Sequence, residues 1–106
     1  MADSKTQERR SEQRIPFKAP ATVNAGQHSL AASTKDISAR GLFFFTDAPL
    51  KEGGEIEIVL MLPEELRLPF SGMVCGYGRA VRIEHCGGHQ YGIAVKIDSL
   101  TPVPQL

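Results

Sequence analysis

Apolar and polar residues alternate along much of the chain beyond residue 20, and this period of two is typical of β-strands with one buried face. The clearest case is Glu55–Leu62, in which four aliphatic side chains fall on one face and Glu55 and Glu57 on the other. Two further alternating segments, Arg79–His85 and Gln90–Ile97, flank a Gly-Gly pair. Two glycines tolerate positive φ, so this pair predicts a tight β-hairpin.

The same pattern predicts other strands in both halves of the chain. They cover Leu30–Ile37, Leu42–Thr46 and Leu68–Cys75, and an edge strand reaches about Val23. No segment has a convincing helical period, and the chain contains 10 glycines. We therefore expect an all-β fold, a six- to seven-stranded antiparallel β-barrel, since closure leaves no exposed sheet edge.

The two ends differ from this pattern. No apolar residue occurs from Asp3 to Arg14, so a helix there would bury nothing, and we expect residues 1–14 to form a flexible polar arm. The barrel is expected over residues 15–98. Residues 99–106 contain Pro102 and Pro104 and are expected to form a tail with little or no C-terminal helix.

Length and charge narrow the function. A chain of 106 residues is a single-domain length, and 12 basic residues balance 12 acidic ones. This neutrality argues against a DNA, RNA or anionic-membrane binder. Residues 1–40, however, have seven basic and four acidic residues, a net charge of +3. A positive field at one end of a neutral body suits a small anionic ligand.

The expected location follows from what the sequence lacks. No apolar run is long enough to insert into a bilayer. The first residues lack the apolar stretch of a signal peptide, so we expect a cytoplasmic protein. In that compartment the two cysteines would be reduced thiols.

Two short motifs bear the chemistry. Arg10 and Arg14 form an Arg-x-x-x-Arg pair, and guanidinium groups bind phosphate and guanine through forked donors and stacking. Between two predicted strands, Asp36 can accept hydrogen bonds from guanine N1–H and N2–H₂, Ser38 can donate or accept, and Gly41 lets backbone approach a ligand. Either motif alone is ordinary surface or turn chemistry.

In this order the segments resemble the PilZ domain family. The resemblance rests on ERRSEQR (residues 8–14), DISARG (residues 36–41) and the strand that Leu42 opens, and extends over roughly residues 8–98. It implies a six-stranded antiparallel barrel that binds the bacterial second messenger cyclic di-GMP. Arg10 and Arg14 would contact guanine and phosphate, Asp36 and Ser38 the polar edge of guanine. Many members also have a C-terminal helix, which the prolines near this chain's end leave little room for.

The predicted ligand site thus consists of Arg9, Arg10, Arg14, Asp36, Ser38 and Gly41. Arg9 is included as a further guanidinium that could help hold a second stacked ligand molecule; the alternative is a solvated charge. We expect the arm to close over the ligand and a protein effector to recognise the new surface, because no output domain accompanies the barrel.

Other interpretations remain open. A PilZ-like adaptor would act through protein contacts without nucleotide. A nucleic-acid-binding barrel would need a basic, aromatic face, which a chain without Trp supplies poorly.

A zinc site could be suggested by four residues, His85, Cys86, His89 and Cys75. No complete ligand set is evident, so no metal or cofactor is expected. No nucleophile–base pair is apparent either, and we expect no enzyme. Of the three consecutive phenylalanines 43–45, at least one must face away from the others.

Overall fold

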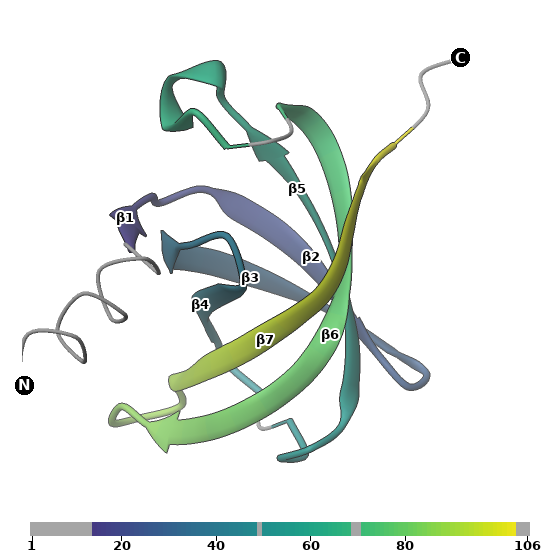
Figure 1. The fold of residues 1–106 in the computed structure, drawn as a ribbon. Coiled ribbons are helices and arrows are strands. Elements are labelled where there is room, and N and C mark those ends of the chain that lie inside the picture. Colours follow the sequence, from purple (N-terminus) through teal and green to yellow (C-terminus); the bar gives the residue numbers. More distant parts are fainter. Residues whose placement is uncertain (1–13, 49, 69–70, 104–106) are drawn as a thin grey trace, which may run out of the picture.

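A computed structural model of the chain describes residues 14–48, 50–68 and 71–103 (Figure 1). It contains seven strands and one short 3₁₀ helix, Glu64–Leu66. The strands are β1 (Ile15–Pro16), β2 (Pro20–Ala25), β3 (His28–Ile37), β4 (Gly41–Thr46), β5 (Glu55–Leu62), β6 (Gly72–His85) and β7 (Tyr91–Pro102). Arg9 and Arg10, with the rest of the predicted arm before Arg14, lie outside the described residues.

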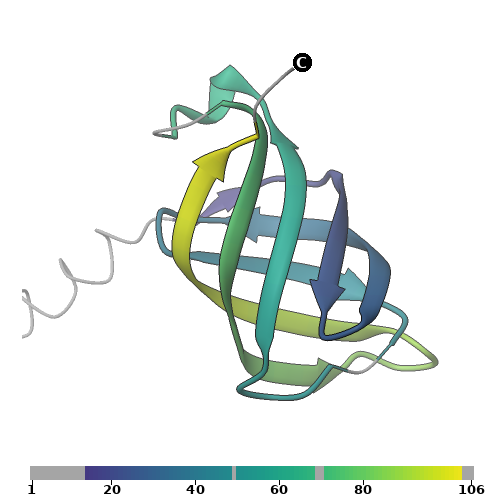
Figure 2. The ribbon, with the colours of Figure 1, turned by 90° about the vertical axis from the view of Figure 1, so that its right-hand side faces the viewer.

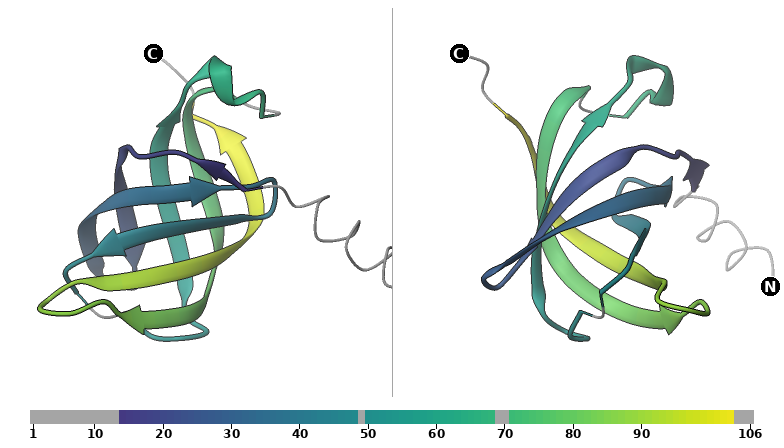
Figure 3. Two further views of the ribbon diagram at one scale, coloured as in Figure 1. Left: turned by 90° about the vertical axis from the view of Figure 1, so that its left-hand side faces the viewer. Right: turned by 180° about the vertical axis from the view of Figure 1, so that it is seen from behind.

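Six strands close into an antiparallel barrel. The sheet order is β1-β3-β2-β5-β6-β7-β4, and an additional β3–β4 pairing joins its ends. The seventh strand, β1, extends the line of β2 along the same edge of β3, opposite Asp36 and Ile37. The views in Figures 2 and 3 show this closed wall from several sides. The predicted all-β barrel of six to seven strands is confirmed.

The barrel interior is filled by the inward face of each strand. The alternation predicted for β5 is confirmed, since its four aliphatic inward residues are all exposed by 4% or less. They pack with inward side chains from the other strands, among them Val23, Ile37, Leu42, Phe44, Val74, Ile93 and Val95. Removal of this apolar surface from water is the main term that stabilises the fold.

The Gly-Gly hairpin is confirmed as well. Gly87 and Gly88 have φ values of 96° and 57°, which few other residues adopt readily. The turn is closed by two backbone hydrogen bonds, from Gln90 N–H to Gly87 O at 3.0 Å and from Cys86 N–H to Gln90 O at 2.9 Å.

The structure corrects two strand boundaries. The segments predicted over Leu68–Cys75 and Arg79–His85 belong to one strand, β6, which begins only at Gly72. Register shifts against β7 at Tyr77/Gly78 and between Ala80 and Arg82 let it continue through its glycines. Such bulges bend a strand and increase its twist, and β6 and β7 both curve strongly in Figure 2.

The last strand is also longer than predicted. β7 passes Ile97 and ends at Pro102, opposite Val74, so the strand includes the first residues of the predicted tail from residue 99. A proline is tolerated at the end of a strand, where its missing N–H interrupts no further ladder. Within the described ranges, no helix is long and apolar enough to cross a membrane.

Candidate functional site

The loop between β3 and β4 is held in place by backbone hydrogen bonds. Ser38 N–H donates to Gly41 O at 2.9 Å, and Ile97 N–H of β7 donates to Arg40 O at 2.8 Å. Ser38 itself is only 4% exposed, with its Oγ 3.5 Å from Gly41 O. The loop is therefore tied to both flanking strands and to β7.

Arg14 reaches this loop from the other side. The short strand β1 places Ile15 and Pro16 opposite Ile37 and Asp36. The guanidinium that precedes β1 then lies against the Asp36 carboxylate, with Arg14 Nη1 2.5 Å from Asp36 Oδ1. The Arg14 side chain is 49% exposed and that of Asp36 19%, so both remain accessible from solvent.

Gly41 lies where these groups meet. A Cβ at this position would lie 3.6 Å from both Arg14 Nη2 and Ser38 Oγ, and 3.2 Å from the backbone oxygen of Val95. The first two distances are ordinary van der Waals separations, so Arg14 and Ser38 lie beside the same point of the backbone, and only the contact with Val95 would be tight. Of the six predicted site residues, the four that the structure describes lie together.

The side chains that meet at Gly41 offer both hydrogen-bond donors and hydrogen-bond acceptors. A guanidinium has five N–H donors in a fixed fork, of which the contact with Asp36 occupies one. The carboxylate of Asp36 offers only acceptors, and the Ser38 hydroxyl can act in either sense. Such a set suits a ligand with an anionic group and a donor-rich polar edge.

Sequence reasoning missed two residues beside this set, Lys35 and Phe43. Lys35 lies in a register shift between Thr34 and Asp36, and its Nζ is 5.2 Å from the centre of the Phe43 ring. Phe43 pairs directly with Asp36 and, unlike Phe44, is not part of the interior cluster. Two features of the sequence could have pointed to them: Lys35 directly precedes Asp36, and alternation along a strand places Phe43 and Phe44 on opposite faces.

The Phe43 ring lies on the outer face of the barrel and is mostly covered. A Cβ at Gly92 would lie 2.6 Å from Phe43 Cζ, so the ring rests on the bare backbone of β7. Phe45 meets it edge to face, with ring centres 5.4 Å apart. As expected, the consecutive phenylalanines divide between the two faces, with 43 and 45 outward.

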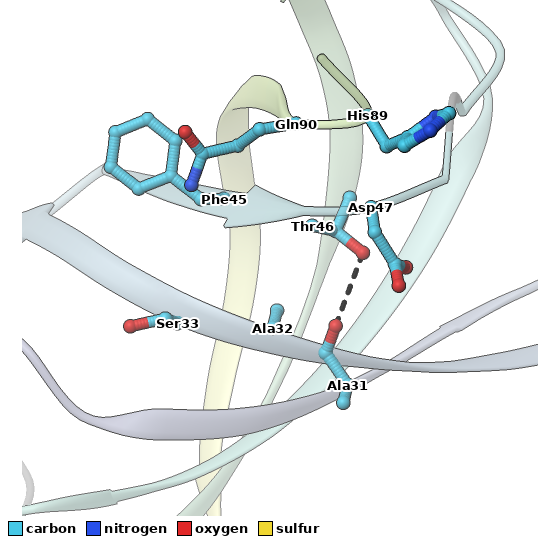
Figure 4. Close-up of a pocket in the computed structure, with 8 residues that line it drawn as sticks. All are labelled: Ala31, Ala32, Ser33, Phe45, Thr46, Asp47, His89 and Gln90. Carbon is cyan, nitrogen blue, oxygen red and sulfur yellow. Dashed lines mark hydrogen bonds between the residues drawn. The ribbon is translucent and has the colours of Figure 1, made fainter. Parts of the chain in front are cut away.

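Two adjoining grooves continue along this outer face. One, of about 470 Å³, lies between the middle of β3, the end of β4 and the hairpin, with Phe45, Asp47, His89 and Gln90 in its lining (Figure 4). The other, also of about 470 Å³, includes Lys18 and Lys35. They share Ser33, Phe45 and Gln90. The sequence analysis identified neither groove, because each is built from segments far apart in the chain.

A second polar cluster lies on β2, β5 and β6. Asn24 donates to Glu57 at 2.7 Å, and this hydrogen bond is the main reason that the pKa of Glu57 is lowered. Burial raises the pKa of the Cys75 thiol, whose Sγ is 3.5 Å from Glu57 Oε2. Hydrogen bonds to Cys75 and Glu57 raise the pKa of Tyr77 to about 12.

The hairpin residues His85 and Cys86 both have contacts within the protein, and Cys86 Sγ lies 3.7 Å from the backbone oxygen of Glu84. His85 stacks on Tyr91 with ring centres 5.0 Å apart, and its Nε2 is 2.9 Å from Gly88 O. Among residues 14–48, 50–68 and 71–103, no group of three or more His, Cys, Asp or Glu side chains is placed to hold a metal ion.

Comparison with known proteins now identifies the family. The model of the PilZ domain matches residues 8–103. The chain belongs to the PilZ domain family. PilZ domains are ligand-binding and adaptor domains, and the family includes receptors for cyclic di-GMP. No curated protein matches this chain.

A solved structure shares the PilZ fold. The inhibitor of motility MotI/DgrA from Bacillus subtilis superposes with a TM-score of 0.68 at 13% sequence identity. The match covers 85% of this chain and 43% of that one, so the present chain spans less than half the length of its structural relative. At this identity the likeness concerns the fold.

Proposed function

We propose that this PilZ domain is a receptor for cyclic di-GMP that binds the dinucleotide at the loop between β3 and β4. The observation that supports the proposal best is the convergence of Arg14, Asp36 and Ser38 at Gly41. Arg9 and Arg10, which precede the described residues, complete the proposed site from the N-terminal arm. The binding chemistry requires no cofactor or metal.

The roles follow from the hydrogen-bonding groups. Asp36 accepts from the N1–H and N2–H₂ of one guanine, and Ser38 bonds to the same polar edge. Arg14 retains donors for a guanine or phosphate oxygen while it contacts Asp36. The ion pair holds the carboxylate and the guanidinium in place before the ligand arrives, which lowers the ordering cost of binding.

The proposed output is a contact with a protein effector in the cytoplasm. In this scheme the arm closes over the bound dinucleotide, and ligand and arm together form the surface that the effector recognises. The ligand shifts the equilibrium between the open and the closed arm only to the extent that it binds the closed state more tightly than the open state. The effector is a protein not yet identified.

One calorimetric titration tests the assignment. Cyclic di-GMP, GTP and a single-stranded oligonucleotide are each titrated into the purified protein, and we expect saturable binding to cyclic di-GMP alone. Arg14→Ala should weaken that binding by about 1–3 kcal/mol, the magnitude of a good bidentate guanine contact.

The matched control is Lys51→Ala, which also removes one positive charge. Lys51 lies beside Gly26 and His28 at the start of β3, whereas Asp36 lies near its end. Eight residues of strand separate the two ends by about 26 Å, so the control should bind normally. Binding to none of the three ligands would favour an adaptor without nucleotide. Saturable binding to the oligonucleotide alone would favour a nucleic-acid-binding barrel.

A further inference from the structure

We propose that the outer groove around Phe45 holds the second half of the dinucleotide, with a guanine on the Phe45 ring and a phosphate near Lys35 and Lys18. The inference rests on the proposed function and extends it. The site at Asp36 and Gly41 explains how one guanine is bound. The groove explains why a ligand with two bases and two phosphates would be preferred over a mononucleotide.

The groove is continuous with the first site along β4. Phe43 pairs with Asp36 and Phe45 with Ser33 on the neighbouring strand, and the two rings touch edge to face at 5.4 Å. Outward side chains two positions apart on a strand are separated by about 7 Å. The distance from Asp36 to the Phe45 ring is thus short enough for one small ligand to contact both.

The lining suits a purine base. Phe45 is partly exposed, and Figure 4 shows its ring beside the Gln90 side chain at the side of the groove. Ser33 lines the same space. An aromatic ring offers a stacking surface for a base, while an amide and a hydroxyl can bond to its polar edge. No hydrogen bond with a described residue occupies the Gln90 amide or the Ser33 hydroxyl.

Positive charge is placed at the end of the groove nearest Asp36. Lys18 and Lys35 both line it there. No carboxylate among the described residues lies within ion-pair distance of either ammonium group. Asp47 and His89 lie in the other part of the groove. This polarity favours a phosphate between Arg14 and the two lysines and a neutral base farther along.

The test compares cyclic di-GMP with guanosine by calorimetry in the parent protein and in charge variants. Lys18→Gln and Lys35→Gln are each expected to weaken cyclic di-GMP binding about two- to fivefold, the range for one solvent-accessible charge contact. The weak binding of guanosine, which has the same base but no phosphate, should be unaffected. Lys51→Gln serves as the charge control, because Lys51 lies between β4 and β5 and borders the far end of β3 at His28. It should leave both affinities unchanged.

A second measurement reports the stacking itself. Ring currents of Phe45 should shift the H8 resonance of one guanine upfield in the proton NMR spectrum of the complex, and Phe45→Leu should abolish that shift. The lysine variants keep the test valid if Phe45→Leu does not fold, since both lysines are exposed.

The outcomes separate the two proposals. If the parent protein binds no cyclic di-GMP, the proposed function fails and this inference fails with it. If the parent binds and Arg14→Ala weakens binding, but the Lys18→Gln/Lys35→Gln double variant binds like the parent, only the groove is overturned. Weaker binding of the double variant to cyclic di-GMP, without a change for guanosine, supports the groove.

Discussion

Arg14 and Asp36 illustrate how a surface ion pair can matter more for a ligand than for the fold. With side chains 49% and 19% exposed, the pair is screened by water, and such pairs contribute about 1 kcal/mol or less to stability. Asp36 nevertheless supplies a charged acceptor beside Gly41. Its proposed value therefore lies in orienting groups for guanine.

Asp36→Asn should separate these two effects. Asparagine keeps the size of the side chain but removes the charge, and its amide can place a donor against the donors of guanine. We expect cyclic di-GMP affinity to fall by about tenfold or more, while the urea midpoint of unfolding changes little. Titration calorimetry and urea unfolding measure the two quantities. Unchanged affinity with a clear loss of stability would make the pair a structural one.

Tyr77 should make the stability of the barrel sensitive to alkaline pH. Hydrogen bonds to Cys75 and Glu57 raise its pKa from 10.0 to about 12. The folded protein thus holds the phenolic proton more tightly than the unfolded chain does. The contribution of this pKa difference to the free energy of unfolding is fully present below about pH 10 and is lost as the pH rises through about 12.

The measurement is urea unfolding at several pH values from about 8 to 12, with the tyrosinate absorbance followed in parallel. The free energy of unfolding should fall less steeply with pH in Tyr77→Phe than in the parent. Tyr91→Phe is the control for the other of the two tyrosines. Equal slopes in the parent and Tyr77→Phe would show that the hydrogen bonds of Tyr77 contribute nothing to this dependence.

At the level of elements, β6 depends on one glycine. A Cβ at Gly78 would lie 2.0 Å from the backbone oxygen of Lys96, where β6 shifts register against β7. A backbone atom cannot move aside as a side chain can. Gly78→Ala should therefore lower the free energy of unfolding by about 3 kcal/mol or prevent folding.

Gly76→Ala provides the comparison on the same strand. There a Cβ would approach only side-chain atoms closely, Ile58 Cγ2 and Leu100 Cδ1, both at 3.3 Å. We expect a smaller loss, near 1 kcal/mol, measured by urea unfolding. A variant at Gly78 as stable as the one at Gly76 would mean that the β6–β7 bulge rearranges easily.

The contrast between β5 and β6 shows what the sequence could predict about elements. The strict alternation of Glu55–Leu62 gave the strand and its buried face directly. In β6 the glycines suggested an interruption, because a bulge stabilised by a neighbouring strand leaves no periodic signal. The extension of β7 to Pro102 was missed for a related reason. A proline is compatible with the last position of a strand, so its presence in the sequence did not show where the strand ends.

Part of the candidate site could likewise be predicted from the sequence, and part could not. Asp36, Ser38 and Gly41 lie in one short segment, at the end of β3, in the connecting loop and at the start of β4, so the motif was sufficient to group them. Arg14 joined them through family resemblance. The adjoining groove brings together Lys18, Phe45 and Gln90 from three separate segments. The pairing of β4 with both β3 and β7, together with the bulge at Lys35, places them side by side.

At the scale of the whole molecule, the barrel is the rigid frame on which these groups are arranged. The β3–β4 and β4–β7 pairings close the ring beside the loop between β3 and β4. The chain is neutral overall, while basic residues are concentrated in its first 40 positions. The molecule therefore offers a local positive field without the general positive charge that long polyanions require.

A ligand that binds only this closed barrel must stabilise it against heat. Cyclic di-GMP at about 100 times its dissociation constant should add about 2.7 kcal/mol to the free energy of unfolding. For a domain of this length, that gain corresponds to a rise in Tm on the order of 10 °C. Scanning calorimetry should show the rise for cyclic di-GMP, none for an oligonucleotide at equal phosphate concentration, and a much smaller one in Arg14→Ala. A neutral barrel that recognises one dinucleotide must distinguish the arrangement of its bases as well as its charge. An equal rise in Tm with the oligonucleotide would therefore mean that the protein responds to phosphate charge alone.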